Sequence, residues 1–187
     1  MPFRINIDSL VFHGKNKQDK DKPMPDMKFC PWCGSSLGIK TIAGKDRTAC
    51  LNGPCGYVFW DNPITVVAAI VEHEGAVILT RSKGWPEKKF GLVAGFLESG
   101  ESPEDAIVRE VREELGLSSE IRDFIGIYTF IQRNQLLLVY YLIAQGRLVV
   151  GEELEEIRRV APEKLRPWPF GTGPAVRDWL ERRQRGG

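Results

Sequence analysis

Residues 102–116 carry the pattern that most constrains the fold of this chain. Ser102 can cap a helix, Pro103 suits its first turn, and Gly116 follows directly after the last apolar position, as a helix end requires. Between these ends, apolar residues recur at the spacing of one helical face: Ile107, Val108, Val111 and Leu115. The segment therefore predicts an amphipathic helix whose apolar stripe is buried against other elements.

Apolar segments on both sides of this helix predict strands. The first is a continuous run rich in β-branched residues, which is typical of a strand buried on both faces. A second amphipathic helix is expected over residues 173–183. The expected strands cover residues 64–71, 76–80, 90–94, 124–130 and 136–144. Strands before and after a helix predict an α/β domain with a mixed sheet.

Composition and charge exclude several classes of protein. Hydrophobic residues make up 42% of the 187 residues and charged residues 27%, the balance of a soluble globular protein. The 26 lysines and arginines nearly cancel the 25 aspartates and glutamates, so no general field draws the chain to nucleic acid or anionic membranes. No apolar run approaches the ~20 residues of a membrane span, and residues 1–22 lack the apolar core of a signal peptide. We therefore expect a cytoplasmic protein with neither a membrane nor a nucleic-acid partner.

The composition of the chain changes twice along its length, which predicts three parts. Residues 1–28 combine a short apolar stretch with a charged run and two prolines, and are expected to form a poorly ordered arm. Residues 29–60 hold all four cysteines and little hydrophobic periodicity, which indicates a unit too small to fold on burial alone. The third part, residues 61–187, holds the expected strands and helices.

Three glutamates share one face of the predicted helix. Glu110, Glu113 and Glu114 are spaced i, i+3 and i+4, so their side chains converge and repel one another unless a cation lies among them. Oxygen donors held on a rigid element suit Mg²⁺ or Mn²⁺. Taken alone, three such residues more often form a solvated acidic face.

The surrounding residues carry a family resemblance. Gly95, then Glu101 after five residues, then the run Arg109–Leu117 after seven more, match the fixed positions of the Nudix box. The resemblance extends over residues 29–183. It implies a Nudix α/β/α sandwich with a mixed sheet, and hydrolysis of a diphosphate linkage in a nucleotide-like substrate.

The resemblance also implies roles for particular residues. Arg109 would orient the catalytic glutamates, and Glu101 would support that arrangement. Coordination of the catalytic Mg²⁺ would fall to Glu110, Glu113, Glu114 and the Gly95 carbonyl.

The general base has two candidate sources. Related enzymes recruit it from the box helix, where Glu110 and Glu113 are candidates, or from a later loop. Glu156 occupies that later region within an acidic stretch, and its other interpretation is a solvated surface acid.

The cysteines form two pairs, Cys30 with Cys33 and Cys50 with Cys55. Four thiolates in two pairs, each followed by glycine, are typical of a tetrahedral structural Zn²⁺ site. Two disulfides or a redox-active pair at Cys30 and Cys33 are the alternatives. The second pair has four intervening residues where the usual zinc knuckle has two.

This cysteine unit is similar to the zinc ribbon of NADH pyrophosphatases and of plant FAD or ADP-ribose pyrophosphatases. Residues 84–86 and 90–96 strengthen the likeness, whereas residues 126–130 replace the SQPW-type motif that marks NADH pyrophosphatases. Within these segments, Trp85 and Phe90 could stack on a base or flavin ring, although aromatic residues are more often packing residues.

The resemblance implies an enzyme that releases a nucleoside monophosphate from ADP-ribose, FAD or NADH, and a homodimer. Two other functions stay open: a nucleotide-sensing regulator that binds nucleic acid, and an RNA-cap hydrolase. A balanced charge and the lack of a helix-turn-helix pattern argue against the regulator.

Overall fold

The computed structural model describes residues 27–185. All but the last two residues of the predicted N-terminal arm, residues 1–28, therefore lie outside the described part. The chain divides into two compact units between Asn62 and Pro63.

The smaller unit is built on one hairpin. Strand β1 (Leu37–Ile42) pairs antiparallel with β2 (Lys45–Cys50), and the turn between them, at Ala43 and Gly44, has positive φ angles of 50° and 74°. A short 3₁₀ turn, η3 (Gly53–Cys55), follows. Of the described hydrophobic residues in this unit, only Cys30, Ala49 and Cys50 are buried. So small an apolar core needs a further source of stability, such as a metal.

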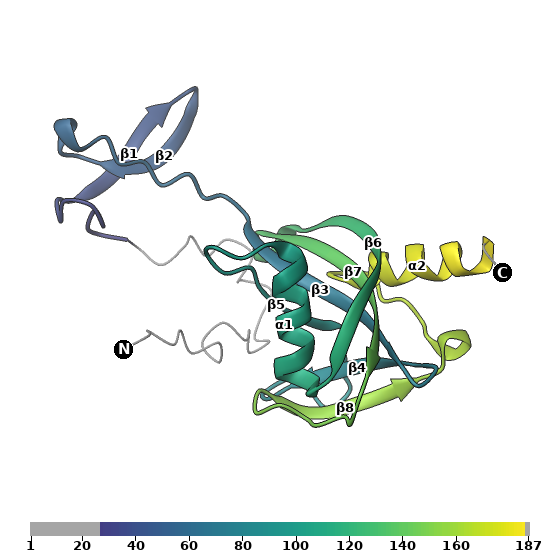
Figure 1. Cartoon of the computed structure of the whole chain (residues 1–187). Helices are drawn as coiled ribbons and strands as arrows, with labels where there is room; N and C mark the ends of the chain where they lie inside the picture. The colour runs from purple at the N-terminus through teal and green to yellow at the C-terminus, as the bar shows by residue number, and fades with distance from the viewer. Residues whose placement is uncertain (1–26, 186–187) are drawn as a thin grey trace. The chain divides into compact units, whose positions relative to one another are not determined.

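The larger unit is a six-stranded mixed sheet (Figure 1). Five strands lie in the order β6, β7, β3, β4, β8, and β5 pairs with β3. β3 runs parallel to β7 from the pair Ile64 and Gln135 to the pair His73 and Ala144, while every other pairing is antiparallel. The strands are β3 (Ile64–His73), β4 (Ala76–Ser82), β5 (Val93–Phe96), β6 (Ser118–Phe130), β7 (Gln135–Gln145) and β8 (Leu154–Val160).

One helix covers each face of this sheet. α1 (Pro103–Leu115) packs on Val67, Ala69 and Val71 of β3, whereas α2 (Gly173–Arg185) packs on the alternate residues of the same strand. Successive side chains of a strand point to opposite faces, so the two helices lie on opposite faces. The predicted α/β/α sandwich with a mixed sheet is therefore confirmed. No helix of the described residues is long and apolar enough to cross a membrane.

Several strands differ from the sequence-based expectation. β1 and β2 were not among the expected strands, and β5 covers Val93–Phe96 rather than residues 90–94. β8 was not predicted, because charged residues dominate it. β6 begins six residues earlier than expected, and its pairing with β7 is irregular on both sides of Asp123. Such irregularities break the alternation on which a strand prediction depends.

Candidate active site

Helix α1 is capped at both ends. The Ser102 side chain accepts a hydrogen bond from the Asp105 backbone N–H (3.1 Å), and its hydroxyl donates to the Asp105 carboxylate (2.7 Å). At the other end Gly116 has a φ of 68°, and its N–H donates to the Arg112 carbonyl (2.9 Å). These caps make α1 a fixed support for its polar side chains.

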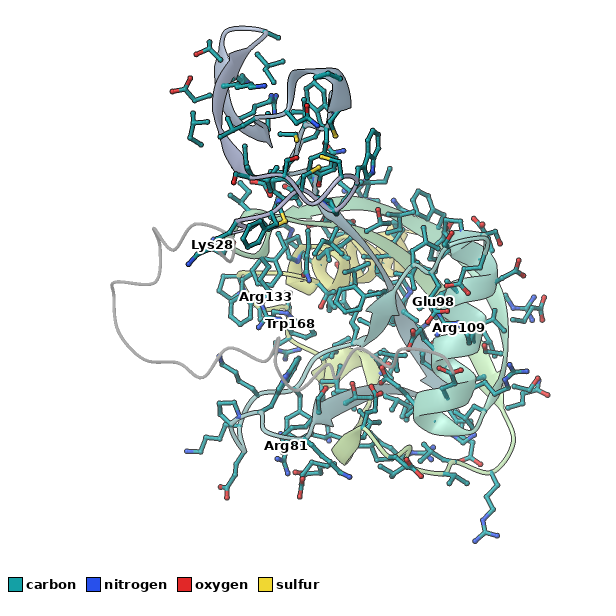
Figure 2. All side chains as sticks on the ribbon, turned by 90° about the vertical axis from the view of Figure 1, so that its left-hand side faces the viewer. Lys28, Arg81, Glu98, Arg109, Arg133 and Trp168 are labelled. Carbon is teal, nitrogen blue, oxygen red and sulfur yellow. The ribbon has the colours of Figure 1, made fainter. Side chains whose placement is uncertain are left out.

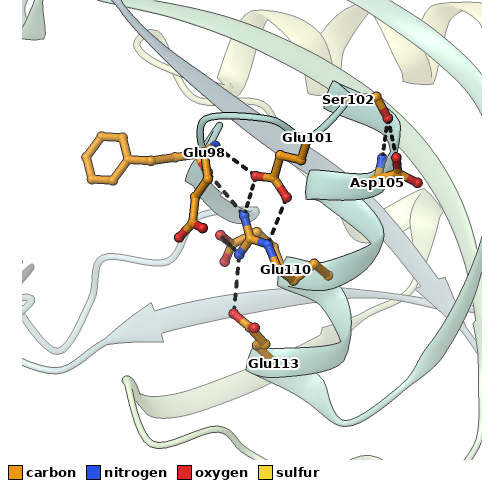
Figure 3. A network of polar contacts seen from close by, with 8 residues as sticks. Glu98, Glu101, Ser102, Asp105, Glu110 and Glu113 are labelled. Carbon is orange, nitrogen blue, oxygen red and sulfur yellow. Dashed lines mark hydrogen bonds and ion pairs between the residues drawn. The ribbon is translucent and has the colours of Figure 1, made fainter. Parts of the chain in front are cut away.

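Figure 3 shows Glu98, Glu101, Glu110 and Glu113 in one polar network, and Arg109 is the residue that joins them. Its guanidinium donates to both carboxylate oxygens of Glu101, at 3.1 and 2.8 Å, and to Glu110 at 2.7 Å. A longer bond of 3.3 Å reaches Glu113. The Glu98 N–H also donates to Glu101, at 2.8 Å. Hydrogen bonds from Arg109 hold the pKa of Glu101 below its usual range, so Glu101 anchors the arginine as a carboxylate.

The close approach of the Glu110 side chain explains why position 95 is a glycine. Gly95 lies on β5 opposite Val67, and a Cβ atom at this position would collide with the Glu110 carboxylate. Only glycine lets the acid pass over the strand at this point. On the same strand, the Phe96 carbonyl accepts a hydrogen bond from Arg109 (3.3 Å).

Glu114 is the most deeply buried acid of the helix. Among the described residues, its Oε2 atom has no hydrogen-bond partner and is shielded from solvent. Burial, with a smaller contribution from the Glu110 charge, raises its pKa to about 8 against the opposing effect of a backbone hydrogen bond from Ala94. Burial also raises the pKa of Glu110, against the influence of Arg109. A divalent cation between these two acids would remove the cost of holding both charges.

The three glutamates are not converged on one point. In the part of the chain that the structure describes, the four cysteines are the one group of three or more potential ligands placed to hold a metal ion, and the three glutamates form no such group. Glu113 is 58% exposed and is held by Arg109. The arginine supplies positive charge beside Glu110 and Glu113 in this arrangement.

Glu156 lies on β8 and pairs with two arginines. Its carboxylate accepts hydrogen bonds from Arg81 of β4 at 3.1 and 3.3 Å, and Arg158 lies 3.8 Å away. The strand register joins Glu156 to Arg81, a relationship that the sequence does not reveal.

A second acid of the same stretch influences the helix carboxylates electrostatically. The charge of Glu153, in the loop before β8, raises the pKa of both Glu110 and Glu114. Sequence reasoning did not single out this residue. The one available signal was its place directly before Leu154, the buried first residue of β8.

The four cysteines come together in the smaller unit. Sγ atoms lie 3.7 Å apart for Cys30 and Cys55, and 3.5 Å apart for Cys33 and Cys50, and all four lie within 4.8 Å. A tetrahedral zinc with Zn–S distances of about 2.3 Å requires sulfurs about 3.8 Å apart. The thiols are free, and the wider second pair accommodates its extra residues in η3. The geometry is compatible with the predicted zinc ribbon.

The thiol environments differ within this cluster. Hydrogen bonds from Ser35 lower the pKa of Cys33 to about 6, whereas burial raises that of Cys50 to about 12. A cation bound to the sulfurs would favour the thiolate at both positions.

Trp85 and Phe90 both make packing contacts. Trp85 lies against Gly91, where a Cβ atom would approach its ring to 3.4 Å. Phe90 lies under the Arg158 guanidinium, 3.9 Å from the ring centre. Their predicted contact with substrate stays a prediction.

The NUDIX domain family pattern matches residues 61–182, which is more than half of the chain. The chain belongs to the Nudix family. Its Nudix domain therefore contains the whole mixed sheet, α1 and most of α2. A NUDIX hydrolase from Nitrosomonas europaea has a similar solved structure, with a TM-score of 0.73 and 27% identity over 86% of this chain and 94% of that one.

Curated relatives of this Nudix hydrolase have two kinds of name. The ADP-ribose pyrophosphatase of Methanocaldococcus jannaschii is 28% identical over 130 residues, which is 66% of this chain and 77% of that protein. The NAD-capped RNA hydrolase NudC of Mycobacterium tuberculosis is 51% identical over 53 residues, covering 27% of this chain and 16% of that protein. The matches to NAD-capped RNA hydrolases thus span about a fifth of those proteins or less.

Proposed function

We propose that this Nudix hydrolase cleaves the diphosphate of a nucleoside diphosphate linked to another moiety, with ADP-ribose as its first substrate, in the presence of Mg²⁺ or Mn²⁺. The observation that carries the proposal is the buried Glu114 oxygen without a partner, next to the Glu110 carboxylate. Two half-buried acids with raised pKa values are costly for stability alone, which favours a role in binding a cation.

The residues that would hold the catalytic metal are those of α1 and β5. Glu110, Glu113 and Glu114 offer carboxylate oxygens, and Gly95 offers its carbonyl, which are the hard donors that Mg²⁺ requires. When bound, the ion neutralises the diphosphate and lowers the pKa of a coordinated water. Glu113 is exposed and can leave Arg109 to reach such an ion.

Arg109 and Glu101 act as positioning residues in this proposal. Glu101 accepts two hydrogen bonds from the Arg109 guanidinium, which in turn donates to Glu110 and holds it in position. Loss of either would misplace Glu110 without removing a metal ligand.

For the base that takes the water proton, we favour Glu153 over Glu156. The charge of Glu153 acts on Glu110 and Glu114, whereas the charge of Glu156 is compensated by Arg81. A base must lie within hydrogen-bond reach of the attacking water, directly or through one further water, so the acid whose charge reaches the helix carboxylates is the better candidate.

The choice of ADP-ribose rests on coverage. The ADP-ribose pyrophosphatase relative matches across most of its own length, while the similarity to NAD-capped RNA hydrolases is high only over a short segment. That short segment nevertheless supports a second candidate, hydrolysis of a nucleotide cap on RNA, which uses the same bond chemistry.

A substrate panel tests the proposal. The full chain is incubated with ADP-ribose, NADH and FAD, with and without Mg²⁺, and AMP is separated by chromatography. We expect AMP from ADP-ribose only with the metal present, and none from the Glu110→Gln variant. Glu120→Gln, which removes the same charge from an exposed site on β6, is the matched control. Failure to release a monophosphate from any of the three with Mg²⁺ or Mn²⁺ would refute the proposal.

A further inference from the structure

A cleft of about 320 Å³ lies on the α2 face of the sheet. Its walls come from the connection between β4 and β5, from β8, and from the segment that follows β8. Five of its eleven lining residues are cationic and none is acidic: Lys88, Lys89, Arg158, Lys164 and Arg166. The chain as a whole has a net charge of only +1, so this cleft concentrates positive charge.

Aromatic rings alternate with these cations. Phe90 and Trp168 line the cleft beside Phe170, which is 50% exposed. Phe170 stacks on Phe130 with ring centres 6.4 Å apart, and the Arg133 guanidinium lies 5.6 Å from the Phe130 ring. Figure 2 shows the labelled Arg133 and Trp168 at this side of the molecule. The aromatic faces and cations thus continue beyond the cleft as one strip.

The positive charge of the cleft is largely uncompensated. Lys88, Lys89 and Lys164 are exposed, and within residues 27–185 none of them forms an ion pair. Among the described residues, the one ion pair of Arg158 is its 3.8 Å contact with Glu156. Exposed lysines are commonly solvated and no more. Gathered around half-exposed aromatic rings without one acid, they instead match the composition of single-strand nucleic-acid sites, where bases stack on rings and phosphates meet cations.

We propose that this cleft binds a single-stranded RNA segment whose 5′ end carries the diphosphate cleaved at α1. The inference rests on the proposed function, in its RNA-cap form, because it assigns the part of the substrate beyond the scissile bond. Lys88, Lys89 and Phe90 belong to the segment that leads from β4 into β5, and Phe90 stands five residues before Gly95. An extended path of about 17 Å at most therefore joins the cleft to the candidate metal site.

The number of cations that line the cleft favours an RNA segment over a single nucleotide as its ligand. The diphosphate of a small substrate would be neutralised by metal at the α1 carboxylates, which leaves five cations of the cleft without a role. A strand places one further phosphate at each nucleotide, so it can use several of these cations at once.

Binding of RNA without turnover gives the cleanest test. A fluorescent ten-nucleotide RNA, about the site size of such grooves, is titrated with the full chain in Mg²⁺-free buffer at two salt concentrations. The test variant is Lys88→Gln/Lys164→Gln, and the control is Arg122→Gln/Arg147→Gln, which removes the same charge elsewhere. A third variant, Phe170→Leu, removes a stacking face and keeps an apolar side chain.

We expect the lysine double variant to bind RNA at least ~10-fold more weakly and to lower the slope of log K against log salt by about 1.4, since two phosphate contacts are lost. Phe170→Leu should weaken binding while leaving the salt slope unchanged. The control should stay within about 2-fold of wild type. Equal losses in the lysine variant and the control would overturn the proposal.

A parallel assay keeps this inference separate from the proposed function. ADP-ribose turnover of the lysine double variant should stay within about 2-fold of wild type. A loss of turnover as large as the loss of RNA binding would make the cleft a pocket for the small substrate and overturn the RNA assignment. Because RNA binding is measured without Mg²⁺, its result stands even if the chain hydrolyses none of the small nucleotides.

Discussion

Gly95 lies directly under the carboxylate of Glu110, with no room for a Cβ atom between strand β5 and that acid. The contact joins the strand to the helix at the point where a metal ligand is proposed. A small change on the strand should therefore be felt as misplacement of the acid.

Gly95→Ala is expected to lower ADP-ribose turnover at least ~100-fold, since a displacement of about 1 Å at a catalytic group has effects of that size. The measurement is kcat at saturating Mg²⁺, with circular dichroism to confirm the fold. Gly53→Ala, where a Cβ atom would meet open space, is the control and should leave kcat unchanged. Wild-type kcat for Gly95→Ala would show that Glu110 tolerates displacement.

Glu113→Gln and Glu114→Gln should each reduce turnover at least ~100-fold while the fold stays intact, because neutralising a ligand weakens the charge stabilisation that the metal supplies. Steady-state rates over a series of Mg²⁺ concentrations measure the effect. Near-normal rates at saturating Mg²⁺ would contradict the ligand assignment.

The raised pKa of Glu114 predicts a pH dependence of stability. Its folded-state pKa of about 8 exceeds the value of about 4.5 expected when unfolded, so the folded chain binds the proton more tightly between these values. Stability is then full below about pH 4.5 and falls as the pH rises toward 8. Urea unfolding of zinc-loaded, Mg²⁺-free protein at pH 5.5 and 8 should show this loss.

Glu114→Gln provides the comparison for that experiment. Its glutamine cannot ionise, so its stability should depend less on pH, and it should be the more stable protein at pH 8 without Mg²⁺. Mg²⁺ should stabilise the wild type at pH 8 more than the variant. Identical pH dependence in both proteins would assign the effect to other groups.

Replacement of the late carboxylates distinguishes the candidate bases. Glu153→Gln should reduce kcat about 100-fold with little change in KM, as expected for a group that moves a proton without binding substrate. Glu156→Gln should have a smaller effect, and Glu155→Gln the smallest. If Glu156→Gln exceeds Glu153→Gln, the base is the residue expected from the sequence alone. Small, equal effects at all three positions would leave the base on α1.

The cysteine cluster should hold about one zinc ion per chain. Elemental analysis of protein purified without chelator measures the zinc content. Cys55→Ser should lose the metal and unfold at lower temperature, because the free energy of zinc binding stabilises the folded state of such small units. An absence of zinc, together with a mass that shows two disulfides, would overturn this prediction.

Local signals in the sequence predicted much of this structure. Ser102, the apolar stripe and Gly116 defined α1, because caps and helical periodicity depend only on neighbouring residues. The same holds for the paired cysteines. β8 was missed because its stability comes from pairing with β4, which lies about eighty residues earlier in the chain.

Parts of the candidate site escaped prediction for the same reason. The pairing of Glu156 with Arg81 depends on the register of β8, and the influence of Glu153 depends on how its loop approaches α1. Neither relationship can be recognised from the spacing of residues in the sequence. Arg109 was predicted to orient the glutamates, and its bonds to Glu101 and Glu110 supply the geometry by which it could do so.

The parallel pairing of β3 with β7 governs the order in which the larger unit can assemble during synthesis. Ile64 meets Gln135 only after about seventy further residues have left the ribosome. Until then, β3 lacks its central neighbour and α1 has no complete sheet on which to bury its stripe. Such non-local closure slows folding relative to helical proteins of similar size. The nascent chain therefore spends that interval with its most apolar strand exposed, which makes it a candidate for chaperone binding before any carboxylate of α1 is in place.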